Sequence, residues 1–319
     1  MPGLGAKLQA MPKQIIYLVL ITVTTIPLFF DVAVPNEPLE ATQDYYATLE
    51  QLPEGSRVLM ASDWTGSTRG ESKGAFRSTL NILIRRKAKI AFYSTADPQA
   101  PRVAQDAINE LNAERRRANL PEFKRWEDWI SLGYFPDSEA ANNGIANDLQ
   151  GAFSGRKDFP PGAPPRDVFQ SPVLEGITKV GQIPLLLIVT ASKTSNFTVE
   201  RIKPDRKTGY PKLLFAVTGV MVPETQVFYQ SKQIAGYCGG LKGVYDLEQL
   251  MENGINFPSK KEAVVKSDKY DVVPGYPSPS NKGQGTRYYP TLHFALALMI
   301  LLVIVGNIGM ALSKREARS

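Results

Sequence analysis

One loop of the sequence gathers the residue types that could hold an anionic ligand. The segment 63–71 reads Asp-Trp-Thr-Gly-Ser-Thr-Arg-Gly-Glu and follows the apolar run 57–62. If that run is a strand of an open parallel sheet, the loop lies at the carboxyl edge, where such sheets bind ligands. Hydroxyls, glycines and an arginine before a helix would place backbone N–H groups and a cation beside an anion. The ligand-binding candidates in this loop are Asp63, Thr65, Ser67, Thr68 and Arg69.

Polar residues after two later apolar runs extend the same candidate site. These residues are Ser192, Lys193, Thr194 and Thr218. The loop matches neither of the glycine-rich phosphate motifs, Gly-x-x-x-x-Gly-Lys-Ser/Thr and Gly-x-Gly-x-x-Gly. A structural interpretation competes with the functional one and is favoured, because Thr68 and Glu71 have the spacing of a helix capping box. Asp63 stays the candidate carboxylate if the protein is an enzyme.

Two residue types are nearly absent, and this excludes several kinds of chemistry. The chain has one histidine, His293, and one cysteine, Cys238, so it cannot form an internal disulfide or a His/Cys metal site. A Ser-His-Asp catalytic triad or a Cys-His dyad is excluded in the region before His293. We expect neither a metal nor a cofactor. No basic stripe with interleaved aromatic residues is present, so we expect no nucleic-acid partner.

Two apolar segments, 15–34 and 292–312, predict two membrane-spanning helices. Each is about 20 residues long, which is the length that crosses the hydrocarbon of a bilayer. The first segment could instead be a cleaved secretory signal, but no Ala-x-Ala cleavage site follows it. Small and polar residues interrupt the second segment and predict a close contact with another helix. These interface residues are Gly306, Asn307 and Gly309.

The charges beside the two segments predict the orientation. The tails 1–14 and 313–319 contain five basic residues and one acidic residue. The outer end of the first segment is acidic instead, with Asp31 at the expected interface and Glu37 and Glu40 beyond it. The positive-inside rule then places both termini in the cytoplasm. The region between the spans would lie in the periplasm or outside the cell, attached to the inner or plasma membrane. Much of the formal net charge of +6 therefore reflects topology.

The exterior region 36–256 alternates between strand-like and helix-like patterns. Short apolar runs predict strands at 57–62, 89–94, 129–134, 183–191 and 213–220. Helical patterns lie between them, and this alternation predicts an α/β, Rossmann-like parallel sheet of about five strands with helices on both faces. Two segments rich in Pro and Gly depart from the pattern. The segment 154–172 is an irregular excursion, and 257–290 is expected to be a tether to the second span.

Four glycines near the end of the exterior region have helical spacing. Gly236, Gly239, Gly240 and Gly243 would share one face if residues 226–252 were a helix. Such a helix would lose about 3–4 kcal/mol relative to alanine, so its glycine face would need close contact with a neighbouring subunit. The competing interpretation is a loop between two shorter helices, with Gly239 and Gly240 as the turn.

Together these features favour a non-catalytic scaffolding subunit of an oligomeric membrane complex. Its expected partners are the lipid bilayer and either further copies of itself or other membrane subunits. The alternative is a membrane-anchored enzyme or ligand-binding domain that acts on a phosphorylated or sugar ligand at the loop 63–71. The first hypothesis is favoured because the unusual features are of interface type and no catalytic constellation is recognisable.

Overall fold

The computed structural model describes residues 10–30, 32, 34–254 and 283–316 of the 319-residue chain. It divides into two compact units, which are described separately. One unit comprises Glu37–Gly285, and the other comprises Met1–Asn36 with Thr286–Ser319.

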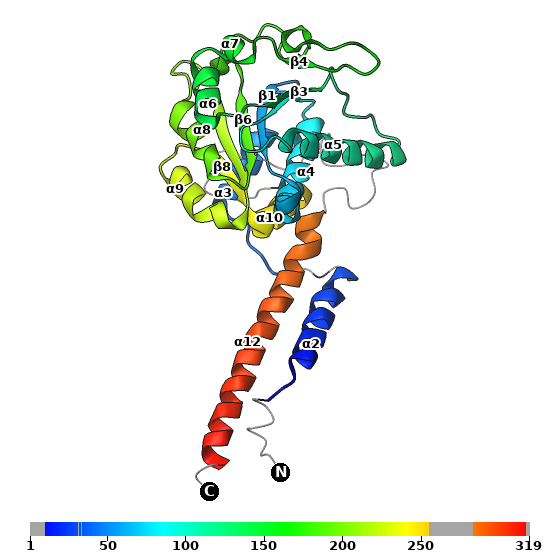
Figure 1. Cartoon of the computed structure of the whole chain (residues 1–319), viewed down its shortest axis with the longest axis vertical. Coiled ribbons are helices and arrows are strands. Elements are labelled where there is room, and N and C mark those ends of the chain that lie inside the picture. The colour runs from blue at the N-terminus through cyan, green and yellow to red at the C-terminus, as the bar shows by residue number, and fades with distance from the viewer. Residues whose placement is uncertain (1–9, 31, 33, 255–282, 317–319) are drawn as a thin grey trace. The chain divides into compact units, whose positions relative to one another are not determined.

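A six-stranded parallel sheet lies at the centre of the larger unit (Figure 1). Its strands are β1 (Arg57–Asp63), β2 (Lys89–Ser94), β3 (Trp129–Tyr134), β6 (Leu185–Thr190), β7 (Lys212–Val217) and β8 (Gly236–Gly239). They are arranged in the order β3-β2-β1-β6-β7-β8, and all neighbours are parallel. This is the strand order of a doubly wound Rossmann sheet. The predicted Rossmann-like α/β fold is confirmed, and β8 adds a sixth strand to the five expected.

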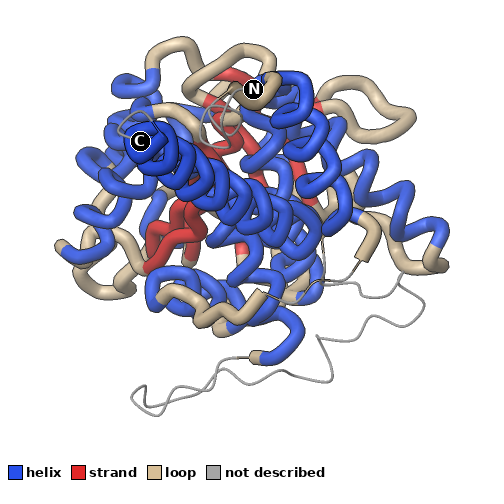
Figure 2. Tube along the Cα trace, turned by 90° about the horizontal axis from the view of Figure 1, so that it is seen from below, coloured by secondary structure: helices blue, strands red, loops and turns tan. Residues whose placement is uncertain are grey.

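Helices cover both faces of this sheet (Figure 2). One face packs against α3 (Glu40–Glu50), α4 (Arg69–Arg85), α5 (Ala100–Arg117) and α10 (Gly240–Asn253). The other packs against α6 (Ser138–Asn147), α7 (Leu149–Phe153), α8 (Asn196–Arg201) and α9 (Val222–Gln230). Continuous apolar runs form the strands because both faces are buried: along β1, Val58 and Met60 face the first layer, and Leu59 and Ala61 the second.

Short 3-10 turns lie in the connections between these elements. They are η2 (Gly66–Thr68), η3 (Val168–Gln170), η4 (Val180–Gln182), η5 (Lys193–Ser195) and η6 (Gly219–Met221). The excursion 154–172 contains a small antiparallel hairpin of β4 (Lys157–Asp158) and β5 (Arg166–Asp167). This hairpin gives the Pro-rich segment a fixed conformation at the edge of the domain.

The predicted glycine face on one helix is wrong. Gly236 and Gly239 belong to strand β8, and α10 begins only at Gly240. The two elements form because Gly240 has a φ of +58°, a conformation that breaks any helix running through it. All four glycines are buried inside the domain: a Cβ on Gly236 would lie 2.4 Å from the Tyr45 backbone N, and one on Gly243 2.9 Å from the Cys238 carbonyl carbon. These close approaches are internal to the domain.

The smaller unit contains α2 (Lys13–Thr25), η1 (Ile26–Leu28) and most of α12 (Gln284–Glu316). Among the described residues, α12 is the one helix long and apolar enough to cross a membrane, and the apolar helix Lys13–Leu28 is shorter. The predicted tether 257–290 lies largely outside the described residues. Its last part is corrected: residues 284–290 are the first turns of α12.

Candidate functional site

The carboxyl ends of the strands bring the predicted site residues to one edge of the sheet. The strand order reverses between β1 and β6, where Asp63 and Thr190 are register partners. In doubly wound sheets, this switch point is the usual ligand crevice. The loops after β1, β6 and β7, which carry the predicted candidates, all begin at this edge. Their side chains, however, are used mainly for contacts within the domain.

Asp63 is the buried centre of this edge, with 4% of its surface exposed. Its Oδ1 accepts hydrogen bonds from Ser94 Oγ at 2.7 Å, Thr95 N at 2.8 Å and Ala96 N at 3.2 Å. Its Oδ2 accepts a longer one from Thr95 Oγ1 at 3.3 Å. Burial raises the pKa of Asp63, and these hydrogen bonds oppose the rise. The carboxylate thus fixes the loop after β2, and these hydrogen bonds all lie within the domain.

The Asp63 network continues into the opposite helical layer. Thr95 Oγ1 lies 3.0 Å from Ser138 Oγ, which lies 3.2 Å from the carbonyl oxygen of Thr194. One polar chain therefore connects the ends of β1 and β2 with α6 and η5. Close to this chain, burial and the negative charge of Asp63 raise the pKa of Tyr93.

Glu71 makes a second contact across the edge. Its Oε2 accepts a hydrogen bond of 2.7 Å from the backbone N–H of Gly219, at the start of η6. The predicted capping box of Thr68 and Glu71 is therefore wrong. The reason is the 3-10 turn before α4: within it, Thr68 Oγ1 accepts a hydrogen bond from Thr65 N at 3.2 Å, which leaves Glu71 to reach Gly219 in η6.

The remaining candidates do not converge on a common point. Arg69 turns towards α5, where it pairs with Glu110 at 2.6 Å. Ser192 Oγ accepts a hydrogen bond from Thr194 N at 3.3 Å within its own turn. Thr65 and Ser67 share a hydrogen bond of 2.8 Å between their hydroxyls. Thr218 is buried at the end of β7, and Lys193 is exposed.

These contacts decide what the edge can do chemically. A phosphate at a Rossmann edge is held by backbone N–H groups at the start of a turn or helix. Here the N–H groups of Thr95, Ala96 and Gly219 already donate to the carboxylates of Asp63 and Glu71. Within the described ranges, no group of three or more His, Cys, Asp or Glu residues is arranged to hold a metal ion. In this conformation the crevice is filled by the chain's own anions.

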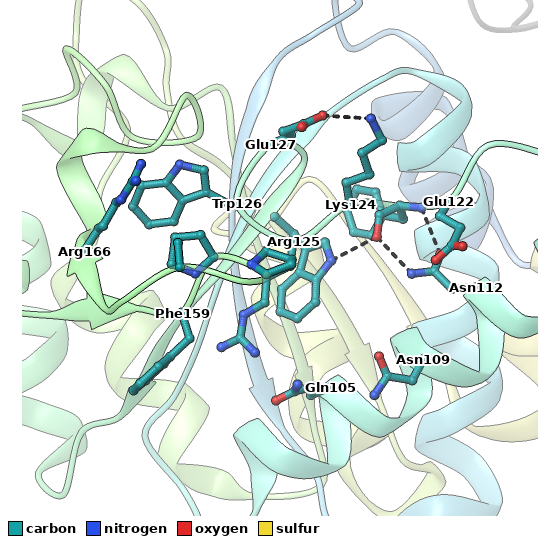
Figure 3. Close-up of a pocket in the computed structure, with 15 residues that line it drawn as sticks. Gln105, Asn109, Asn112, Glu122, Lys124, Arg125, Trp126, Glu127, Phe159 and Arg166 are labelled. Atoms are coloured by element: carbon teal, nitrogen blue, oxygen red, sulfur yellow. Dashed lines mark hydrogen bonds and ion pairs between the residues drawn. The ribbon is translucent and has the colours of Figure 1, made fainter.

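A groove that the sequence did not predict lies elsewhere on the domain. It has a volume of about 790 Å³ and lies between α5, the segment 122–129 and the β4–β5 hairpin (Figure 3). None of the predicted site residues lines it. Two features of the sequence could have indicated this groove: Trp126 and Trp129 lie close together, and the Pro-rich excursion 154–172 supplies its other wall.

Comparison with known proteins identifies no family model, no curated protein and no solved structure that matches this chain.

Proposed function

We propose that the protein is a non-catalytic, membrane-anchored subunit of a membrane complex. Its Rossmann-like domain would be presented in the periplasm or outside the cell, with both termini in the cytoplasm. Its partners would be the lipid bilayer and either further copies of the chain or other membrane subunits.

The observation that carries this proposal is that side chains of the domain itself bind the N–H groups at the carboxyl edge of the sheet. Asp63 and Glu71 occupy the backbone N–H groups that would otherwise hold an anionic substrate. Asp63 accepts from four donor groups, so it is poorly suited to act as a general base, which must reach a substrate proton. An edge organised in this way favours a structural or binding role for the domain.

The membrane part of the proposal rests on both apolar helices. The helix α12 has the length and composition of a span. The helix α2 buries none of its residues, and Tyr17, Leu18 and Ile21 are at least 60% exposed. An apolar helix without protein cover is stabilised by lipid. With Asp31 at the membrane interface, Val32, Ala33 and Val34 would extend the first segment to about the 20 residues of a span.

Two measurements test the proposal. Native mass spectrometry of the particle extracted from membranes should give a mass above that of one chain. Trypsin added to intact spheroplasts should cut after Lys157 and Arg166, both exposed in the excursion. A monomeric particle would contradict the subunit role. Protection of both sites in spheroplasts but not in lysed cells would reverse the topology.

One observation favours the alternative, an anionic ligand at the same edge. The Ser72 and Thr218 hydroxyls and the Trp64 indole N–H are buried and make no hydrogen bond within the described part of the chain. Ser72 follows Glu71, and Thr218 precedes Gly219, so an anion that displaced Glu71 would find further donors nearby. The test is calorimetric titration of the full chain with inorganic phosphate and with ADP. Saturable binding that Glu71→Gln strengthens would establish the alternative, and its absence in both proteins would exclude it for these ligands.

A further inference from the structure

The groove of Figure 3 combines aromatic rings with open polar side chains. We call it the aromatic groove and define it by Gln105, Asn109, Trp126, Trp129, Phe159 and Arg166. Phe159 is 57% exposed, although it lies within a hollow that could cover it. Large aromatic rings are normally buried, so an exposed ring at the rim of a groove indicates a contact surface.

The floor of the aromatic groove is a rigid, charge-neutral platform. The Arg125 guanidinium lies 5.2 Å from the centre of the Trp129 ring and 6.0 Å from that of Phe159. It also pairs with the buried Asp158, with 2.5 Å between Nη2 and Oδ1 and 3.1 Å between Nε and Oδ1. The charge of this arginine is therefore paired with Asp158, and its guanidinium lies close to two aromatic rings of the groove.

Trp126 is held in a strained conformation beside this platform. Its φ is +77°, which is unfavourable for a bulky side chain. Two hydrogen bonds of 2.7 Å fix its backbone: its N–H donates to Trp129 O, and its carbonyl accepts from Ser171 Oγ. The fold thus maintains a conformation that glycine would adopt more easily, and the result is a half-buried indole at the groove (Figure 3). Strain of this kind is common at ligand clamps.

The polar groups of the groove suit a ligand with many hydroxyls. Gln105 and Asn109 lie one turn apart on α5 and extend towards the groove (Figure 3). Neither side chain makes a hydrogen bond to another described residue. A carboxamide both donates and accepts, as a hydroxyl group does. The charged residues Lys124 and Glu127 pair with each other at 3.1 Å, and Arg166 at the far rim stays available for a further contact.

We propose that the aromatic groove binds an oligosaccharide. The C–H faces of sugar rings would stack on Trp126 and Phe159, and their hydroxyls would bond to Gln105 and Asn109. The groove is open to solvent, and this suits a chain of sugar rings better than a single small molecule, which is usually enclosed. A proline-rich peptide also packs on aromatic grooves, but its backbone carbonyls need donors only, whereas both carboxamides here offer acceptors as well.

Binding of defined probes to the full chain in lipid nanodiscs tests this proposal. Nanodiscs are used because maltoside detergents would themselves present a sugar. The probes are maltohexaose, cellohexaose, chitohexaose and a galacturonate oligomer, with decaproline as the peptide competitor. We expect saturable binding of at least one saccharide, measured by calorimetry and by tryptophan fluorescence.

Substitutions connect the binding to the groove. Trp126→Gly removes the indole, so it should weaken binding by about tenfold or more. The φ there favours glycine, which offsets part of the stability lost when the indole no longer packs against the core. Gln105→Ala should also weaken binding, and Gln150→Ala, at an exposed glutamine of α7, should not. The proposal is overturned if no saccharide binds, if binding persists in both groove variants, or if decaproline alone binds. Loss of binding accompanied by unfolding of Trp126→Gly would be resolved by Gln105→Ala, which leaves the aromatic rings intact.

Discussion

The Glu71 carboxylate accepts a hydrogen bond from the backbone N–H of Gly219, which lies 148 residues further along the chain. The contact joins the start of α4 to the turn after β7 and puts a negative charge where a Rossmann domain often binds phosphate. A Cβ on Gly240 would lie 3.1 Å from Gly219 Cα, so the start of α10 also packs at this point. Three segments distant in sequence therefore meet around one carboxylate.

We expect removal of this carboxylate to destabilise the domain modestly. Glu71→Ala should lower the free energy of unfolding by about 0.5–1.5 kcal/mol, because it removes one hydrogen bond near the surface. Glu71→Gln should cost less, since its amide oxygen still accepts from Gly219. Urea unfolding of the full chain measures both effects. Equal midpoints for wild type and Glu71→Ala would show that the contact contributes no stability.

The buried carboxylate of Asp63 predicts a pH-dependent difference between wild type and Asp63→Asn. Burial raises the folded-state pKa above the ordinary value of 3.8. The folded protein then binds more protons than the unfolded chain between these two pKa values, so this group lowers stability as the pH rises through that window. Asparagine does not titrate. The stability of Asp63→Asn relative to wild type should therefore increase from pH 3.8 upwards and level off above the raised pKa.

Urea unfolding across this pH range measures the difference, and Asp63→Ala is the companion variant. Alanine leaves the N–H groups of Thr95 and Ala96 without their acceptor at every pH, so it should cost about 1–3 kcal/mol throughout. If the relative stability of Asp63→Asn instead decreases as the pH rises, the carboxylate is stabilised in its charged form and its pKa is not raised.

Gly236 should tolerate no side chain at all. A Cβ there would lie 2.4 Å from Tyr45 N and 2.8 Å from Tyr45 Cα, and backbone atoms cannot move aside as a side chain can. We expect Gly236→Ala to lower the free energy of unfolding by about 2–3 kcal/mol. The control is Gly70→Ala in the exposed first turn of α4, where a Cβ meets nothing within 4 Å and alanine should be neutral or stabilising by up to about 1 kcal/mol. Similar melting temperatures for the two variants would contradict this packing.

The sequence predicts the sheet well because its signal is local. The strands β1, β6 and β7 are continuous apolar runs, and a strand buried on both faces requires such a run. Strand β8 was missed because its residues Gly236, Tyr237, Cys238 and Gly239 carry no strand pattern. Tertiary contacts explain these glycines: the α3 backbone approaches Gly236 closely, and the Val222 side chain approaches Gly239. Their helical spacing is a coincidence.

The sequence predicted where the candidate edge lies, but not that its polar residues would bond to other parts of the domain. The rule for parallel sheets locates Asp63, Ser192 and Thr218 at one edge from their places after strands. The hydrogen-bond partners of Asp63 and Glu71 lie on other loops, far away in the sequence. Contacts between residues so far apart cannot be predicted from local residue spacing. The aromatic groove was missed for the same reason, because Gln105, Trp126 and Phe159 come from three segments that only the fold brings together.

Two buried carboxylates of α10 hold the points where the chain enters and leaves the domain. Asp246 Oδ2 accepts a hydrogen bond of 3.0 Å from Leu39 N, and Glu248 Oε1 accepts one of 3.0 Å from Gly285 N. Both side chains are fully buried. The start of α12 also packs tightly there, since a Cβ on Gly285 would lie 2.5 Å from Tyr245 N. Both contacts lie within the larger unit, close to its first and last residues.

We expect Glu248 to hold the first turn of α12 on the domain. Glu248→Ala should lower the free energy of unfolding by about 1–3 kcal/mol, because it leaves the buried Gly285 N–H without this acceptor. It should also speed hydrogen exchange at that amide, whereas Glu248→Gln keeps an acceptor and should protect it. The control is Glu252→Ala, one turn further along α10 on a partly exposed side chain. If exchange at Gly285 is equally slow in Glu248→Ala and Glu252→Ala, the attachment depends on backbone packing around Tyr245 and not on the carboxylate.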